Sequence, residues 1–297
     1  MKIEEGVELA LFTTFGSGGP ARGFVRARSE DAVLQALAWA AERNLPVLPL
    51  GFGSNLLVAD EGVEMLALRL EGELASVEVA GEGLLVAGGG AADALCAHVA
   101  RAAGLAGLEF AAAIPGTVGG GVCMNAGAWG SDFGAVLARA LVVDSRGSRW
   151  LEPGALGLRY RGSELEPGKV VVRAEFRLTP SSAQEIERGV LANKAQRKSG
   201  QPVGIRSFGS VFKNPEHELG AGQMIDACGL KGKQIGGARI SPEHGNFIEN
   251  SGGATTADAL ALMSEARRLV HERFGVVLEP EVRLVGGISL PALSAGV

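Results

Sequence analysis

The feature that most constrains this sequence is a run of 22 residues, between Glu109 and Asp132, that contains no charged side chain. The run is long enough to cross a bilayer, but Pro115 and six glycines would leave backbone groups unsatisfied in lipid. We therefore expect a buried glycine-rich loop and no membrane span. Glycines let backbone N–H groups approach a ligand closely, and several such donors together can hold a diphosphate without a nearby cation. A tightly packed turn without a ligand is the alternative interpretation.

A second glycine-rich segment strengthens the ligand-binding interpretation. An apolar strand expected at 46–50 runs into Gly51-Phe52-Gly53-Ser54-Asn55, and another apolar strand is expected at 56–58. The segment is not a dinucleotide fingerprint of the Rossmann type, because Leu56 occupies the position of the third glycine and no helix follows directly. The sequence also lacks a GxxxxGK[ST] motif, which argues against a P-loop ATPase.

Length and composition agree with a soluble enzyme of more than one lobe. A chain of 297 residues suggests about two domains and a large core. The net charge of −5 gives no electrostatic footprint for nucleic acid. The N-terminal residues lack the basic and apolar regions of a signal peptide, so we expect a cytoplasmic protein. The three cysteines and four histidines have no ligand spacing, which predicts reduced cysteines and no metal site.

Local patterns predict the order of helices and strands. Ser29 is a helix N-cap followed by two acidic residues, and Thr255 with Asp258 resembles a capping box for a long helix that ends at Gly275. From 278 to 284 apolar and charged residues alternate, as expected for a strand. The other expected elements are strands at 21–28, 137–144 and 169–178, a hairpin of 75–79 with 84–86, and helices at 91–103, 183–197 and 221–228.

Nine short motifs follow one another along nearly the whole chain. They are Thr14-Phe-Gly-Ser-Gly-Gly19-Pro-Ala, Gly51-Phe-Gly-Ser-Asn55, Ile114-Pro-Gly-Thr-Val-Gly-Gly120, Asn125-Ala-Gly127, Tyr160-Arg-Gly-Ser163, Gly209-Ser-Val-Phe-Lys-Asn-Pro215, Ile235-Gly-Gly-Ala238, Asn246-Phe-Ile248 and Leu278-Glu-Pro-Glu-Val-Arg283. Together they resemble the UDP-N-acetylenolpyruvoylglucosamine reductase family, flavoenzymes of bacterial peptidoglycan precursor synthesis. No single motif is specific, but nine in order leave little room for chance.

The resemblance implies an α+β chain, with a two-lobed FAD-binding domain of the vanillyl-alcohol-oxidase type and a C-terminal α/β domain that binds the UDP-sugar. We expect the two lobes at 1–70 and 71–180 and the substrate domain at 181–297. The short stretch from Arg146 to Arg159 suggests the shorter subtype of the family, which lacks an element folded over the substrate. The residues that the resemblance assigns to non-covalent FAD are Gly51, Phe52, Gly53, Ser54, Asn55, Pro115, Gly116, Thr117, Gly119, Gly120, Asn125, Ala126 and Gly127.

The implied reaction is the NADPH-driven reduction of UDP-N-acetylglucosamine enolpyruvate to UDP-N-acetylmuramate, with hydride passing from flavin N5 to the enolpyruvyl β-carbon. Negative charge then develops on the substrate carboxylate, so the site needs a carboxylate clamp and a proton donor. By resemblance Arg161 is the clamp, Ser210 donates the proton, and Glu281 is a protonated acid near the carboxylate. Without the resemblance, each residue has a simpler interpretation. Arg161 could be a surface arginine, Ser210 could be an ordinary turn serine, and Glu281 could lie on the solvated polar face of a strand.

The resemblance extends to substrate contacts, for which we expect Tyr160, Lys213, Asn214, His244 and Asn246, and to a monomeric state. Arg197 and Lys198 end an expected helix, from which they could reach the UDP diphosphate, but the helix dipole favours basic residues at this end without any ligand. Two other functions stay open. A flavin oxidase of the same fold would favour a covalent histidine or cysteine link, and neither glycine-rich loop offers a histidine. A non-catalytic FAD or nucleotide-sugar module would lack one of the three expected catalytic residues, all of which are present.

Overall fold

The structure is a computed structural model that describes residues 1–293, with an α+β architecture and two compact units. Unit 1 comprises 1–6, 22–52 and 64–197, and unit 2 comprises 7–21, 53–63 and the described residues from 198 onwards. These units differ from the three contiguous ranges expected from the sequence, because 7–21 and 53–63 pack with the C-terminal third of the chain. Unit 1 contains two separate hydrophobic cores, and unit 2 is built around a third.

The first core of unit 1 lies around helix α1 (Glu30–Ala41). The helix begins as predicted, because the Ser29 hydroxyl accepts a hydrogen bond from the Ala32 N–H at 3.3 Å. Val33, Ala36 and Leu37 are buried on the face that packs in this core. The adjacent sheet has the strand order β1 (Ile3–Glu4), β3 (Pro20–Ala27), β6 (Val63–Leu70) and β4 (Val47–Pro49), with β4 parallel to β6.

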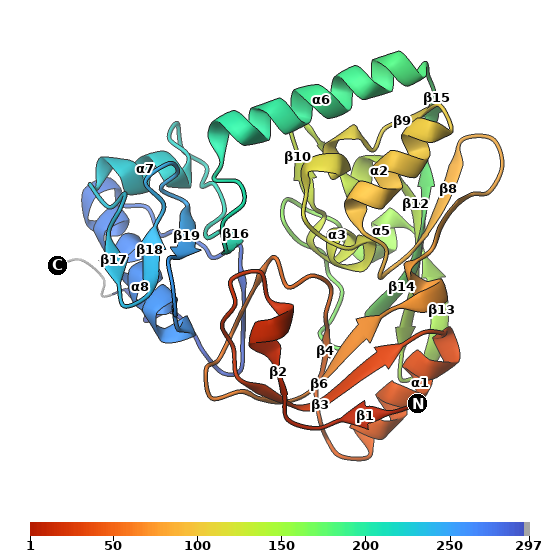
Figure 1. Ribbon diagram of the computed structural model, residues 1–297, viewed down its shortest axis with the longest axis horizontal. Coiled ribbons are helices and arrows are strands. Elements are labelled where there is room, and N and C mark those ends of the chain that lie inside the picture. The colour runs from red at the N-terminus through yellow and green to blue at the C-terminus, as the bar shows by residue number, and fades with distance from the viewer. Residues whose placement is uncertain (294–297) are drawn as a thin grey trace. The chain divides into compact units, whose positions relative to one another are not determined.

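The second sheet of unit 1 is antiparallel and buried on both faces. Along β12 (Leu137–Asp144), Ala140 and Val142 point into the second core, whereas Val143 belongs to the core around α1. Helices α2 (Asp93–Ala102) and α3 (Val118–Met124) pack in the second core, beside strands β8 (Leu84–Gly88) and β14 (Val170–Arg177) (Figure 1). The strand order is β13 (Gly147–Leu151), β12, β14, β8 and β7 (Val77–Val79).

The charge-free run is not a loop throughout. Its first four residues belong to the 3-10 helix η3 (Glu109–Ala113), and α3 occupies its middle. Glycine is a poor helix former, but a Cβ on Gly121 would lie 2.7 Å from the Phe133 ring, and one on Gly119 would lie 3.0 Å from the Gly89 carbonyl oxygen. Close packing of the bare helix backbone therefore outweighs the low helix propensity. The prediction of a loop is wrong for residues 118–124.

Unit 2 places helices α7 (Ala221–Ala227) and α8 (Thr256–Phe274) beside a four-stranded antiparallel sheet (Figure 1). The predicted capping box of α8 is confirmed, with Thr255 and Asp258 bonded in both directions, and Gly275 ends the helix with φ +69°. The regular strand is shorter than the one predicted at 278–284. Arg283–Val285 (β20) pairs in parallel with β5 (Leu56–Val58), whereas Pro280 forms only an isolated bridge with Phe212. The sheet order is β16 (Ser207–Ser210), β19 (Phe247–Asn250), β18 (Ala238–Ile240) and β17 (Gln234–Ile235).

The remaining elements are short, except for helix α6 (Ala183–Gly200), which extends three residues beyond the predicted end. Within residues 1–293, no helix is long and apolar enough to cross a membrane. The short elements are β2 (Val7–Glu8), η1 (Leu9–Phe12), η2 (Gly72–Ala75), β9 (Leu105–Ala106), β10 (Gly127–Ala128), β11 (Ser131–Asp132), α4 (Phe133–Val136), α5 (Pro153–Leu156) and β15 (Thr179–Pro180).

Candidate functional site

Two of the segments expected to bind FAD meet inside unit 1. A Cβ on Gly51 would collide with the hydroxyl of Thr117, so the bare Cα of Gly51 packs against the Thr117 side chain at this point. Thr117 is buried, while Phe52 remains 38% exposed. The other three residues of this loop, 53–55, belong to unit 2. The structure thus brings Gly51 and Phe52 together with the segment 115–127.

The start of α3 offers backbone donors that the protein does not use. Within the described residues, the N–H groups of Gly116, Thr117 and Gly120 donate no hydrogen bond to another residue. Their neighbours are satisfied, since the N–H groups of Val118 and Gly119 donate to the carbonyl oxygens of Ala91 and Gly89. Three unused donors in a segment without charges are the type of backbone groups that can bind an anion such as a diphosphate.

Asn125 holds the end of this segment in place. It adopts a left-handed conformation with φ +41° and ends α3. Its side-chain oxygen accepts from the Gly134 N–H at 2.8 Å, and its amide nitrogen donates to the Arg159 carbonyl oxygen at 3.3 Å. Ala126 donates its N–H to the Gly121 carbonyl oxygen, and Gly127 opens β10. These bonds give Asn125 a scaffolding role between α3 and the turn at Arg159.

The expected carboxylate clamp, Arg161, lies on that turn. Arg159 and Gly162 exchange two backbone hydrogen bonds, and Arg161 between them has φ +53°, a conformation that non-glycine residues adopt rarely. The Ser163 hydroxyl donates to the Cys123 carbonyl oxygen at 2.8 Å, which ties the turn to α3. The Arg161 guanidinium carbon lies 5.0 Å from the ring centroid of Tyr160, whose side chain is largely exposed. Arg161 is therefore positioned by the segment expected to bind FAD.

In unit 2, the expected proton donor Ser210 follows a β-bulge. Ser207 pairs with Glu249 and Ser210 with Phe247, so β16 uses one more residue than β19 over this stretch. Gly209 supplies the bulge with φ +78°. Within residues 1–293, the Ser210 hydroxyl makes no hydrogen bond, and its side chain is half-buried. A β-bulge changes the direction in which a neighbouring side chain points. Here it leaves the Ser210 hydroxyl available for a hydrogen bond to a ligand.

Glu281 lies on a segment that pairs with the residues after Ser210. The Glu281 N–H donates to the Val211 carbonyl oxygen at 2.9 Å, and the Lys213 N–H donates to the Glu279 carbonyl oxygen at the same distance. The Asn55 amide donates to the Glu281 carbonyl oxygen at 3.2 Å. The structure therefore brings Ser210, Glu281 and Asn55 onto neighbouring segments of unit 2.

The other expected substrate residues of unit 2 already have structural partners. Asn246 is buried, and its side chain accepts from the Phe212 N–H at 2.9 Å and donates to the Phe212 carbonyl oxygen at 2.7 Å. The His244 ring nitrogen Nδ1 accepts from the Asn246 N–H at 3.1 Å, and burial lowers the pKa of His244, so that the ring is neutral near pH 7. Asn214 accepts from the first N–H of α7, and Lys213 pairs with Glu279 at 2.7 Å.

One polar residue beside the expected FAD segment escaped the sequence-based prediction. Asp93 begins α2 and is 1% exposed, and burial raises the pKa of its carboxyl to about 8. The only sequence signal was an acid in the first turn of a helix, which the helix dipole explains without any site. Arg197, which the sequence placed at a helix end, is half-buried and donates to the Ala113 carbonyl oxygen.

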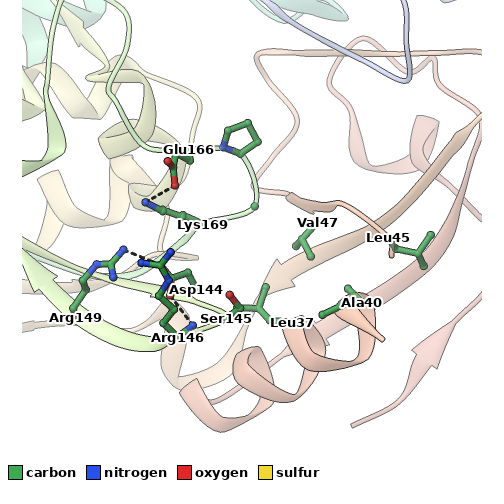
Figure 2. Close-up of a pocket in the computed structure, with 13 residues that line it drawn as sticks. Leu37, Ala40, Leu45, Val47, Asp144, Ser145, Arg146, Arg149, Glu166 and Lys169 are labelled. Carbon is green, nitrogen blue, oxygen red and sulfur yellow. Dashed lines mark hydrogen bonds and ion pairs between the residues drawn. The ribbon is translucent and has the colours of Figure 1, made fainter. Parts of the chain in front are cut away.

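A pocket of about 420 Å³ opens elsewhere in unit 1, between α1 and the β12–β13 hairpin (Figure 2). Its lining includes Arg146, Arg149 and Lys169, but two of these cations are paired. Arg149 lies 2.7 Å from Asp144, and Lys169 lies 2.9 Å from Glu166. The pocket therefore has little net charge, and none of the expected site residues lines it.

Comparisons with known proteins match both parts of the chain. Residues 21–150 match the FAD binding domain, and residues 201–285 match the UDP-N-acetylenolpyruvoylglucosamine reductase C-terminal domain. Proteins named UDP-N-acetylenolpyruvoylglucosamine reductase from Symbiobacterium thermophilum and Rubrobacter xylanophilus are 43% and 44% identical, over 96% and 94% of this chain and 92% and 93% of their own. The crystal structure of the reductase from Thermus caldophilus is 38% identical, with a TM-score of 0.85 over 96% of this chain and 99% of that chain.

Proposed function

The chain belongs to the UDP-N-acetylenolpyruvoylglucosamine reductase family, and we propose that it reduces UDP-N-acetylglucosamine enolpyruvate to UDP-N-acetylmuramate with NADPH as the reductant. The observation that carries this proposal is the match of residues 201–285 to the reductase's own C-terminal domain. An FAD binding domain alone would fit a flavin oxidase equally well. The proposal includes a role in peptidoglycan synthesis, a monomeric state and a cytoplasmic location.

FAD is the cofactor of this family member, and the residues of unit 1 fit it. The unused N–H groups of Gly116, Thr117 and Gly120 are suited to a diphosphate, and Gly51 packs against Thr117 with no room for a side chain. When bound, FAD supplies a group that accepts hydride from NADPH and delivers it to the substrate. The protein's own task is to hold this group and to prepare the substrate for the transfer.

We expect the FAD to be held without a covalent bond, because neither glycine-rich segment contains a histidine. The purified protein should be yellow, and acid precipitation should release the yellow chromophore into the supernatant. Absorbance of the supernatant near 450 nm measures the released fraction, on the order of one FAD per chain. Colour that stays with the pellet would contradict this prediction, and a colourless protein that takes up no added FAD would overturn the proposed function.

We assign the chemistry of the substrate to three side chains. Arg161 takes the substrate carboxylate in a bidentate fork and stabilises the charge that develops on it, because its guanidinium stays charged throughout. Ser210 gives its hydroxyl proton to the α-carbon that receives charge, for which the free hydroxyl after the bulge is suited. Glu281 acts in its protonated form, since an ionised carboxylate would oppose the growing negative charge.

The remaining substrate contacts in this proposal come from Tyr160, Lys213, Asn214, His244 and Asn246. Because the Asn246 side chain is bonded at both ends to Phe212, it serves the substrate by positioning the backbone after Ser210. His244 contributes a neutral ring, because its pKa is lowered by burial. Lys213 would reach a substrate phosphate only by breaking its ion pair with Glu279. The glutamate of this pair is exposed, so breaking the pair costs little.

We also expect the two substrates to react in turn, because the nicotinamide and the enolpyruvyl carbon exchange hydride with the same atom of the cofactor. Initial rates measured against each substrate should give parallel lines in double-reciprocal plots, with inhibition at high concentrations of the enolpyruvyl substrate. Intersecting lines would indicate that both substrates bind together, and this part of the proposal would then be wrong.

A further inference from the structure

The start of α2 contains a carboxylic acid that the proposed chemistry does not use. Asp93 is the first residue of the helix and is 1% exposed, and neither of its carboxyl oxygens has a hydrogen-bond partner within the described residues. An acid in this position normally bonds to water or to the free N–H groups of the helix. A buried polar group without a partner is rare in proteins and marks a place where the structure is under constraint.

The Asp93 carboxyl lies directly against the segment expected to bind FAD. The Asp93 N–H donates to the Gly116 carbonyl oxygen at 3.1 Å, and the Val118 N–H donates to the Ala91 carbonyl oxygen at 2.9 Å, so the two backbones are paired. A Cβ on Gly116 would lie 2.5 Å from Oδ2 of Asp93. The carboxyl therefore occupies the space above the bare Cα of Gly116.

The surroundings of Asp93 favour an uncharged carboxyl. Ala91 and Cys96 on either side of it belong to the hydrophobic core of this lobe, and burial raises the pKa of Asp93 to about 8. Within the described residues, no ionisable group on the elements packed against it forms a hydrogen bond with its carboxyl, although a charge on Asp93 would raise the pKa of the Cys96 thiol further. Glu109 on η3 bonds to the Gly107 N–H at 2.9 Å. The others are Glu78, exposed on β7, Cys123 on α3, and Cys96, His98 and Arg101 on α2 itself.

We infer that Asp93 is a positioning residue for FAD, which keeps the backbone of residues 116–117 in its binding conformation only while its carboxyl is uncharged. This inference rests on the proposed function, in which that backbone holds the cofactor diphosphate. An ionised Asp93 needs water, and because the Gly116 backbone lies directly against the carboxyl, we expect hydration of the carboxylate to displace this backbone. The diphosphate is itself anionic, so its charge opposes ionisation of a carboxyl behind the same backbone.

FAD affinity should therefore depend on pH and should be highest where the Asp93 carboxyl is uncharged. The affinity is constant while Asp93 is protonated and falls as the pH rises through its pKa of about 8. For a single proton, the dissociation constant of FAD should rise about tenfold per pH unit above that value, so that binding at pH 9 is about tenfold weaker than at pH 7.

The test measures FAD dissociation from the holoenzyme between pH 6.5 and pH 9, by the fluorescence of FAD released on dilution. The wild-type protein should show the tenfold weakening, whereas Asp93→Asn, which is uncharged and similar in size, should give a flat curve whatever its absolute affinity. Cys96→Ala is the matched control and should keep the wild-type curve, since burial raises the pKa of the Cys96 thiol to about 12. If Asp93→Asn fails to fold, Asp93→Leu replaces it with the same expectation.

The outcomes separate this inference from the proposed function. A wild-type affinity that does not change with pH, or an Asp93→Asn curve with the wild-type slope, overturns the role of Asp93 while FAD binding stands. A protein that binds no FAD at pH 6.5 fails the proposed function instead. A purely structural role would lower stability or affinity at every pH and would leave the slope unchanged.

Discussion

Ser210→Ala is expected to abolish most of the reaction with the enolpyruvyl substrate while leaving the reaction with NADPH nearly intact. Only the first reaction needs a proton for a carbon atom, and the hydroxyl after the bulge is the proposed source of that proton. Loss of a general acid lowers rates by roughly 10²-fold to 10⁴-fold. Stopped-flow absorbance near 450 nm follows the two half-reactions separately, with NADPH bleaching the flavin colour and the substrate restoring it.

Two further variants make this prediction specific. Ser210→Cys keeps a proton donor of similar reach and should recover part of the lost rate. Ser207→Ala removes a serine hydroxyl from the same strand before the bulge, so both half-reactions should keep the wild-type rate. The role of Ser210 is wrong if Ser210→Ala restores the flavin colour at the wild-type rate, or if the whole loss falls in the reaction with NADPH.

Much of the fold was predictable from local sequence signals. The N-cap at Ser29 and the capping box of Thr255 with Asp258 involve residues a single turn apart, so their bonds form wherever the helix forms. The strand at Leu56, which argued against a dinucleotide fingerprint, is confirmed as β5. The motifs also predicted the family correctly, because nine of them in order constrain the chain more than any one motif does.

Features that depend on distant partners were not predictable. Helix α3 forms on a glycine-rich sequence because Gly121 packs against Phe133, a contact with no local signature. The β-bulge before Ser210 is defined by its pairing with β19, which lies about 40 residues further along the chain. The Asp93 carboxyl packs against the bare Cα of Gly116, and nothing in the sequence links the two residues. Each of these features lies beside an expected site residue.

Replacing Arg161 by glycine should separate the stability of the protein from its activity. Arg161 has φ +53°, which costs a non-glycine residue about 1 kcal/mol or more, whereas glycine adopts this conformation freely. We therefore expect Arg161→Gly to melt close to the wild-type temperature, measured by circular dichroism, because the relieved strain offsets the side-chain interactions that are lost, among them the contact with Tyr160. A residue kept in a strained conformation at a net cost in stability is expected where the side chain has a function.

The activity of Arg161→Gly should fall sharply in the reaction with the enolpyruvyl substrate. Without the guanidinium fork, the charge that develops on the substrate carboxylate loses two hydrogen bonds, and removal of such a group lowers kcat/KM by roughly 10²-fold to 10³-fold. Arg161→Lys keeps the positive charge but not the bidentate fork, so its kcat/KM should lie between the values of the wild-type protein and Arg161→Gly. The reaction with NADPH should be unaffected, because it involves no substrate carboxylate.

Arg159→Ala is the matched control for this pair of variants. Arg159 lies on the same turn, its side chain is 61% exposed, and its ion pair with Glu164 is long at 3.9 Å. Exposed pairs of this kind contribute less than about 1 kcal/mol, so stability and kcat/KM should both stay close to the wild-type values. An equal loss of activity in Arg159→Ala would mean that the turn needs positive charge in general. A wild-type kcat/KM in Arg161→Gly would remove Arg161 from the proposed mechanism, and the strained conformation would then need another explanation.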